Sequence, residues 1–191
     1  MNAQTPVSPY VRPAIVDDAE GIAKVHVRGW QEAYAGLLAK EVLDRQSVAR
    51  RMREWTEYLK EPPGHRWTFV AIDPAQGIVG FAGAHRARPA PYGPTFKITV
   101  LYILQSHLRR GLGRQLIHAL ARALAEAGPG AVALWSLEAN RPARAFYAAI
   151  GGRLTAILAE RQGDSRVTLA GYRWRSAADL AGKTAPQQSA T

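Results

Sequence analysis

The sequence predicts an α/β fold with a mixed sheet, antiparallel at its start and parallel in the middle. Residues 67–72 and 78–88 are strand-like runs joined by the turn Asp-Pro-Ala-Gln-Gly, which is the signature of a β-hairpin. Residues 97–104 and 131–137 contain stretches that are apolar on both faces, as in strands covered on both sides. A helical segment separates these two runs. A strand, a helix and a strand in this order form a right-handed βαβ unit with parallel strands.

The remaining elements follow from capping residues, apolar periodicity and turn signals. They are a strand at 10–15, helices at 19–35, 47–60 and 142–150, a helix from the glycine-containing turn at 109–113 to residue 127, and strands at 154–158 and 167–174.

The chain has 191 residues, which is roughly one domain at ~150 residues per domain. We expect a flexible tail at 1–9, a single domain at 10–175 and a disordered tail at 176–191. The last segment is small, polar and poor in large apolar residues, a composition that does not build a core.

The composition limits the possible functions. There are 25 Lys and Arg against 15 Asp and Glu, and the resulting net charge of +10 favours an anionic ligand or partner. The chain has no cysteine, which excludes disulfides, thiolate metal sites and a cysteine nucleophile. His26, Glu32 and His85 show no metal-ligand spacing, so we expect no metal.

No targeting or membrane-spanning segment is visible in the sequence. The first ten residues lack a basic region followed by an apolar one, and the longest apolar run, 100–104, is too short to cross a bilayer. We therefore expect a cytoplasmic protein with no membrane partner.

The most informative segment is Arg-Arg-Gly-Leu-Gly-Arg at 109–114, between a buried strand and a helix. Helix N-termini present unpaired N–H groups and a partial positive charge, and arginines add fork-shaped donors, so this turn predicts a phosphate-bearing ligand. It is not a Walker A loop, and Leu116 stands where a dinucleotide fingerprint needs a third glycine. The alternative is a plain turn with solvated arginines.

The segment at 134–147 favours a ligand-binding turn at 109–114 over a plain turn. Leu-Trp-Ser-Leu-Glu-Ala-Asn at 134–140 leads into Pro-Ala-Arg-Ala-Phe-Tyr at 142–147, followed by a Gly-Gly pair. With the 109–114 turn, this resembles the GNAT acyltransferase superfamily. Its acyl-CoA loop typically has the pattern Gln/Arg-x-x-Gly-x-Gly/Ala, and its second signature is a strand, an Asn and a helix that carries Phe-Tyr. The resemblance covers about residues 10–174 and is strongest over 97–152.

The resemblance implies a GNAT-like mixed sheet and an N-acetyltransferase that moves an acetyl group from acetyl-CoA to a primary amine by direct attack in a ternary complex. Tyr147 would protonate the departing thiolate, and Asn140 would contact the reactive arm of the donor. Backbone groups at 101–103 would pair with the pantetheine arm and polarise the thioester carbonyl. The residues implied in donor binding are Leu101, Tyr102, Ile103, Arg109, Arg110, Gly111, Leu112, Gly113, Arg114 and Asn140.

The acceptor side departs from the family pattern. Many members carry a carboxylate as general base at the start of the strand where this chain has Lys97. A substitute base is Glu32, His26 or His85, or bulk water takes the proton. Lys97 in the cleft would favour an acceptor with a carboxylate near its amine. The candidate acceptor-binding residues are Trp30, Tyr34, His85, Lys97 and Glu138.

Each of these residues also has a structural interpretation. Trp30 and Tyr34 have the helical spacing of core aromatics, His26 is a packing or surface histidine, and Glu138 is a hydrogen-bonded carboxylate. His107 and His118 are expected in solvent.

Other functions remain open on the sequence. Small amines, antibiotics, amino-acid-like compounds and peptide amines are all possible acceptors, and family members commonly form homodimers. A non-catalytic acyl-CoA-binding regulatory module is favoured by Lys97 and disfavoured by the intact Asn140 and Tyr147. Nucleic-acid binding rests on charge alone, and no helix-turn-helix or aromatic-basic signature supports it.

Overall fold

A computed structural model describes residues 8–37, 40–62, 64–88, 93–162 and 165–186. The strands are β1 Tyr10–Pro13, β2 Arg66–Asp73, β3 Gly77–Arg86, β4 Phe96–Ile103, β5 Val132–Leu137, β6 Arg153–Gln162 and β7 Ser165–Trp174. The helices are α1 Ala19–Tyr34, α2 Lys40–Asp44, α3 Val48–Lys60, α4 Leu112–Glu126, α5 Arg141–Ala149 and α6 Ala177–Thr184, with short 3₁₀ turns at Val16–Asp18 and Gln105–His107.

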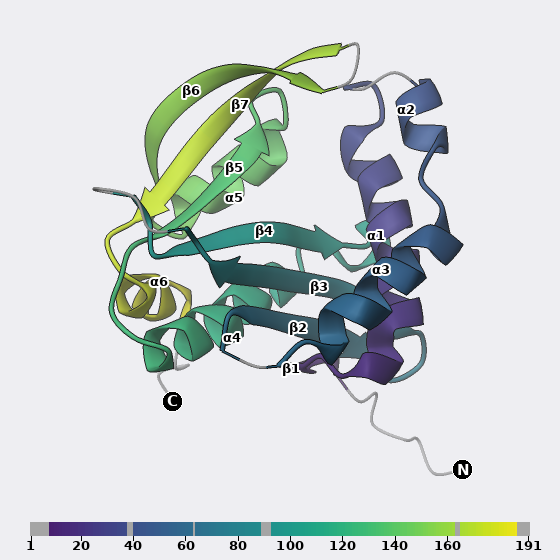
Figure 1. The fold of residues 1–191 in the computed structure, drawn as a ribbon, viewed down its shortest axis with the longest axis horizontal. Helices are drawn as coiled ribbons and strands as arrows, with labels where there is room; N and C mark the ends of the chain where they lie inside the picture. The colour runs from purple at the N-terminus through teal and green to yellow at the C-terminus, as the bar shows by residue number, and fades with distance from the viewer. Residues whose placement is uncertain (1–7, 38–39, 63, 89–92, 163–164, 187–191) are drawn as a thin grey trace.

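The strands form one mixed sheet in the order β1-β2-β3-β4-β5-β7-β6 (Figure 1). All neighbours pair antiparallel except β4 and β5, which pair parallel because α4 carries the chain back between them. The predicted fold class is therefore confirmed. The predicted helix and strand boundaries up to residue 150 differ from the structure by about two residues, as is usual where helix and strand ends fray.

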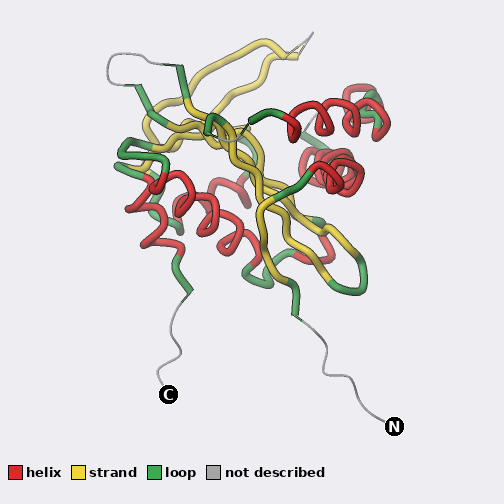
Figure 2. The backbone as a smooth tube through the Cα atoms, turned by 60° about the horizontal axis from the view of Figure 1, so that its bottom comes forward, coloured by secondary structure: helices red, strands yellow, loops and turns green. Residues whose placement is uncertain are grey.

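Helices cover the sheet on two sides (Figure 2). On one side α1 and α3 enclose a core that includes Ile22, Trp55 and Phe81. On the other side α4 supplies the predicted stripe of Leu112, Leu116, Leu120 and Leu124, each at most 2% exposed. These two cores fix the sheet between its helices.

The C-terminal segment differs from the sequence expectation. Disorder was expected from residue 176, yet Ala177–Thr184 forms α6, and Leu180 is fully buried against the α4-side core. The Ser176 hydroxyl accepts the Asp179 backbone N–H and caps this helix. One large apolar residue is enough here because the neighbouring alanines are small. The His118 side chain, expected in solvent, lies 3.0 Å from the Ala181 carbonyl oxygen of α6.

Candidate active site

The site begins where β4 and β5 separate. The two strands are in register only at Phe96 with Val132 and at Lys97 with Ala133. Beyond these pairs β4 continues to Ile103 alongside β3 alone. Its other edge therefore has no strand partner, and backbone donors and acceptors on it remain available to a ligand.

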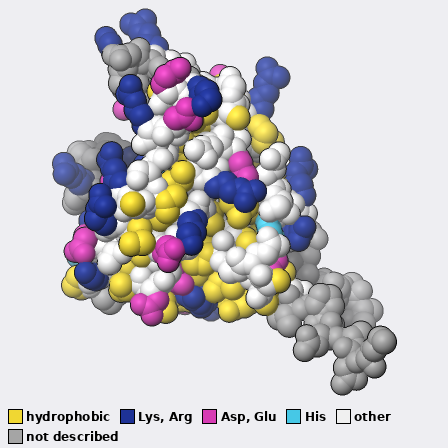
Figure 3. Space-filling view, turned by 90° about the vertical axis from the view of Figure 1, so that its right-hand side faces the viewer, with side chains coloured by type: hydrophobic (Ala, Val, Ile, Leu, Met, Phe, Trp, Pro, Cys, Tyr) yellow, Lys and Arg dark blue, Asp and Glu magenta, His cyan; other side chains and the backbone are white. Residues whose placement is uncertain are grey.

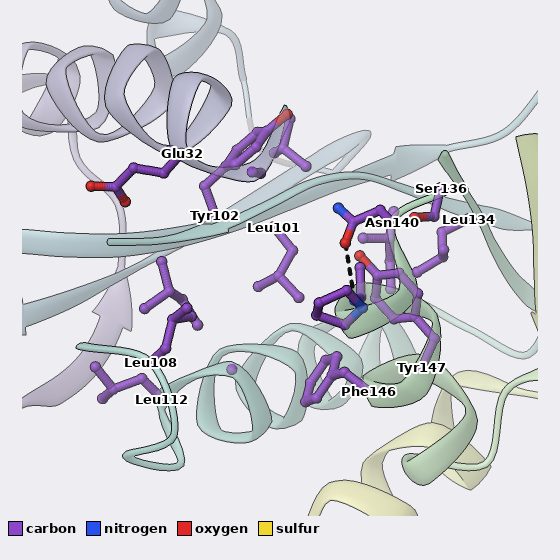
Figure 4. Close-up of a pocket in the computed structure, with 18 of the residues that line it drawn as sticks. Glu32, Leu101, Tyr102, Leu108, Leu112, Leu134, Ser136, Asn140, Phe146 and Tyr147 are labelled. Atoms are coloured by element: carbon purple, nitrogen blue, oxygen red, sulfur yellow. Dashed lines mark hydrogen bonds between the residues drawn. The ribbon is translucent and has the colours of Figure 1, made fainter. Parts of the chain in front are cut away.

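A cavity of about 680 Å³ occupies this opening (Figure 4). That volume lies within the range of small-molecule sites, roughly 300–1,000 Å³. Its described lining comes from α1, β4, the 105–111 loop, α4, β5 and α5: Gly29, Glu32, Ala33, Tyr34, Ile98, Thr99, Val100, Leu101, Tyr102, Ile103, Gln105, His107, Leu108, Arg109, Gly111, Leu112, Gly113, Arg114, Leu134, Trp135, Ser136, Asn140, Pro142, Ala143, Phe146 and Tyr147.

The N-terminus of α4 forms one end of the cavity. Arg109 and the N-cap residue Gly111 both have left-handed backbone, with φ of 62° and 78°, so the chain turns sharply before the helix starts. A Cβ on Gly113 would lie 3.3 Å from Ile103 Cδ1 and 3.4 Å from Phe146 Cζ, so glycine allows α4, β4 and α5 to approach closely. The first-turn N–H groups have no intrahelical acceptor and are suited to an anion.

The three arginines of this turn have different positions. Arg109 and Arg114 line the cavity, whereas Arg110 is exposed beside it and does not. Arg114 Nη1 donates to the Lys183 carbonyl oxygen at 2.5 Å, so α6 holds this guanidinium. The sequence indicated the arginines but gave no sign of their contact with α6.

Asn140 and the helix that follows it, α5, form the wall around Tyr147. Asn140 is the N-cap of α5, and its Oδ1 accepts the Ala143 backbone N–H at 3.2 Å. Tyr147 lies on the following turns with its side chain 9% exposed. Burial, and then the neighbouring Tyr34 and Tyr172, raise the pKa of the Tyr147 phenol well above its usual range. The Tyr147 phenol is therefore neutral at physiological pH.

Glu138 has a structural position behind this wall. Its Oε1 accepts from Arg144 Nη1 at 2.6 Å, and Arg144 Nε donates to the Tyr172 hydroxyl at 3.2 Å. The Tyr172 ring in turn lies 5.6 Å from the ring of Tyr147. Glu138 does not line the cavity, and its ion pair with Arg144 favours the interpretation of a hydrogen-bonded structural carboxylate over that of an acceptor-binding residue.

Helix α1 supplies the opposite wall with Tyr34 and Glu32. Glu32 Oε2 accepts the Gln105 backbone N–H at 2.8 Å, and Oε1 accepts from Arg28 Nε at 2.8 Å. Burial, together with Tyr34, raises the pKa of the Tyr102 phenol well above its ordinary value. Among the described lining residues, Glu32 is the single acidic side chain.

Four residues considered for the acceptor side or as the base do not line the cavity in the described part of the chain: Trp30, His26, His85 and Lys97. Trp30 packs edge-on against Tyr34 at 4.6 Å, and its indole N–H is buried with no described partner. His26 accepts the Trp55 indole N–H through Nδ1 at 3.1 Å inside the α1-side core. Its packing interpretation is the one that this geometry supports.

His107 is a cavity residue that the sequence did not indicate. It was expected in solvent but is 1% exposed, with Nε2 at 3.0 Å from Asp73 Oδ2 and Nδ1 at 2.8 Å from Ser106 Oγ. The contact holds the start of the 105–111 loop to the end of β2. No local pattern reveals it, because Asp73 precedes His107 by 34 residues.

In the described ranges no group of three or more His, Cys, Asp or Glu is placed to hold a metal ion. None of the described helices is both long enough and apolar enough to cross a bilayer.

Comparison with known proteins agrees with this geometry. The sequence profile of the acetyltransferase (GNAT) family matches residues 30–151, so the chain belongs to that family. It is 29% identical over 139 residues to YuaI of Bacillus subtilis, an uncharacterized N-acetyltransferase, with 73% of this chain and 77% of that protein covered.

Two solved structures share the fold. PaiA N-acetyltransferase from Thermoplasma acidophilum, solved with coenzyme A, has a TM-score of 0.64 at 15% identity over 88% of this chain and 99% of its own. YncA from Salmonella typhimurium, solved with acetyl-CoA, has a TM-score of 0.67 at 15% identity over 88% of this chain and 94% of its own.

The buried His26 predicts a loss of stability in acid. Burial, and to a lesser extent the nearby Arg51, lower the pKa of His26 to about 4, whereas an unfolded histidine titrates near 6.5. Between these values the unfolded chain binds a proton that the folded chain does not, so the free energy of unfolding should fall as pH drops from about 6.5 to 4, by up to ~3 kcal/mol.

Urea unfolding from pH 7.5 to 4.5 measures this loss. A His26→Gln variant should be less stable at pH 7.5, but its free energy of unfolding should depend less on pH, because one fewer proton is bound on unfolding. If both proteins show the same pH slope, His26 is not the group responsible.

Proposed function

We propose that this protein transfers an acetyl group from acetyl-CoA to a primary amine by direct attack in a ternary complex. The observation that carries the proposal is that one cavity joins the α4 N-terminus, the unpaired edge of β4 and Tyr147. Membership of the GNAT family supports the reaction class, and the coenzyme A and acetyl-CoA in the PaiA and YncA structures support the donor.

The donor's pyrophosphate is assigned to the α4 N-terminus. Helix N–H groups at 112–114 and the guanidinium of Arg109 would hold it, with Arg110 adding positive charge from outside the cavity. The pantetheine arm is assigned to the unpaired edge of β4 at 101–103, which has the extended backbone that such an amide chain can pair with. Asn140 closes this path at the start of α5.

Acetyl-CoA supplies an acetyl thioester, and attack by the amine nitrogen forms the amide bond as the carbon–sulfur bond breaks. Backbone N–H groups of β4 stabilise the negative charge that develops on the carbonyl oxygen. Tyr147 donates its hydroxyl proton to the departing sulfur. Because burial raises the pKa of this phenol and so makes it a weaker acid, the proton moves only as negative charge develops on the sulfur. Glu32, directly or through water, accepts the proton lost by the amine nitrogen.

Glu32 is assigned this role over the other candidates on position. His26 uses Nδ1 to accept the Trp55 N–H, and neither His26 nor His85 lines the cavity. Glu32 lines it, and each of its oxygens keeps a further lone pair beside the bond that it already accepts.

Gly111→Asp tests the donor site. Aspartate at this N-cap would place a side chain and a negative charge against the proposed pyrophosphate position, so affinity for acetyl-CoA by calorimetry should fall at least roughly tenfold, as expected for a lost charge-assisted contact. Gly128→Asp is the matched control, because Gly128 also has a positive φ but lies at the other end of α4 with open space around it. Equal affinity in the two folded variants would contradict the assignment.

Tyr147→Phe tests the proton donor. The ring stays and the proton is removed, so turnover should fall by roughly 10²- to 10⁴-fold while acetyl-CoA affinity changes little. Tyr58→Phe makes the same change in a half-buried phenol outside the cavity and should keep full turnover. Full turnover in Tyr147→Phe would show that the thiolate takes its proton elsewhere, and no turnover in the native protein with any amine would favour a non-catalytic module.

A further inference from the structure

A row of basic residues crosses the sheet in register, next to the cavity. Residues directly opposite one another in neighbouring strands point to the same face of a sheet. The pairs that connect the row are Arg66 with His85, His85 with Lys97, Lys97 with Ala133, Ala133 with Arg173, and Arg173 with Arg153. We call Arg66, His85, Lys97, Arg173 and Arg153 the basic row.

The row lies on the face opposite α4. Phe96, Val132 and Trp174, each one residue away along its strand, are buried in the α4-side core, so their neighbours in the row point the other way. In Figure 1, α1 and α3 stand over the right-hand part of this face, and no described helix stands over the left-hand ends of β3, β4 and β7. Arg153 is exposed, and Lys97 is partly exposed.

The same face continues into the cavity. Trp135 lies two residues beyond Ala133 and hence on the same face, and it lines the cavity. Thr99, at the bulge of β4 that follows Lys97, lines the cavity beside it. The Trp135 ring covers Gly171, where a Cβ would come within 2.8 Å of Trp135 Cζ3. At ~3.3 Å per residue along a strand, the row begins roughly 7 Å from the cavity wall.

Little acidic charge offsets the row. Strands β3, β4, β5 and β7 contain no Asp or Glu. Arg66 is paired with Glu61 at 2.7 Å, and Arg173 Nη2 donates to the Gly93 carbonyl oxygen. Among described residues, neither Lys97 nor Arg153 takes part in an ion pair.

The helices show a different pattern. Arg28 pairs with Glu32, and both Arg50 and Arg51 pair with Glu54. Figure 3 shows basic and acidic side chains interspersed on the side of the molecule that these helices form.

Positive side chains gathered on one face of a sheet favour an anionic ligand at that face. The donor is assigned to the α4 side, which leaves this face and its entry past Thr99 and Trp135 to the acceptor. Building on the proposed function, we infer that the acceptor is a primary amine that also carries an anionic group, a carboxylate or a phosphate, which the basic row holds.

Acetyl transfer to matched amines tests this inference. One pair is a tetrapeptide amide with glutamate at the third position and its glutamine counterpart; the other is 6-aminohexyl phosphate and 6-aminohexanol. Thiol release from acetyl-CoA should be faster with the anionic member of at least one pair, and the pair that responds separates a carboxylate from a phosphate. Rising salt should reduce this preference by screening.

Lys97→Gln should remove most of the preference. The KM for the anionic acceptor should rise roughly tenfold or more, as for a lost charge-assisted hydrogen bond, with little change for acetyl-CoA or the neutral amine. Arg122→Gln makes the same charge change at an exposed position of α4 and should leave the KM values for the anionic and the neutral acceptor unchanged. The midpoint of thermal unfolding should change little in Lys97→Gln, because Lys97 is partly exposed and makes no ion pair with the described residues.

The outcomes separate this inference from the proposed function. Equal rates for both members of both pairs, or unchanged acceptor kinetics in a folded Lys97→Gln, would overturn the anionic acceptor and leave the acetyltransferase intact. Absence of thiol release with every amine would count against the proposed function itself.

Discussion

The divergence of β4 from β5 is the constraint on which the site depends. Two parallel pairs join the strands and then the pairing stops, so the rest of β4 keeps an edge without a partner inside the sheet. In most folds such an edge is a liability that must be covered. Here α4 and α5 both begin beside the opening, and their N-termini and the phenol of Tyr147 face one cavity. We propose that the backbone which the sheet leaves unpaired is the binding surface for the donor.

The opening also divides the chemistry between the two faces of the sheet. On the α4 side the helix N-terminus, Arg109 and the apolar wall around Phe146 suit a long phosphate-bearing donor. On the other side, Thr99 and Trp135 lead to a row of cations without acidic residues on the central strands. Tyr147 packs in the α4-side core beside the cavity, and burial raises the pKa of its phenol. The N-terminus of α4 on one side and the basic row on the other therefore favour anionic groups on both faces of the sheet.

Much of this arrangement could be predicted from the sequence, because its signals are local. The βαβ unit, the glycine turn at 109–114 and the Asn140-to-Tyr147 spacing each lie within one stretch of chain, and their elements are confirmed. What could not be predicted depends on contacts between distant residues. The pairing of His107 with Asp73 has no local pattern, and α6 lacks the apolar content of an ordinary helix. The basic row is visible only in the strand register, because its members are spread over five strands.

Hydrogen–deuterium exchange with and without acetyl-CoA tests the central claim most directly. If the open edge of β4 holds the donor, amides at 98–103 and at 112–114 should exchange more slowly when acetyl-CoA is bound. Amides of β3 at 80–85, already paired with strands on both sides, should change little. Binding that slows exchange only elsewhere, with 98–103 unchanged, would contradict the account.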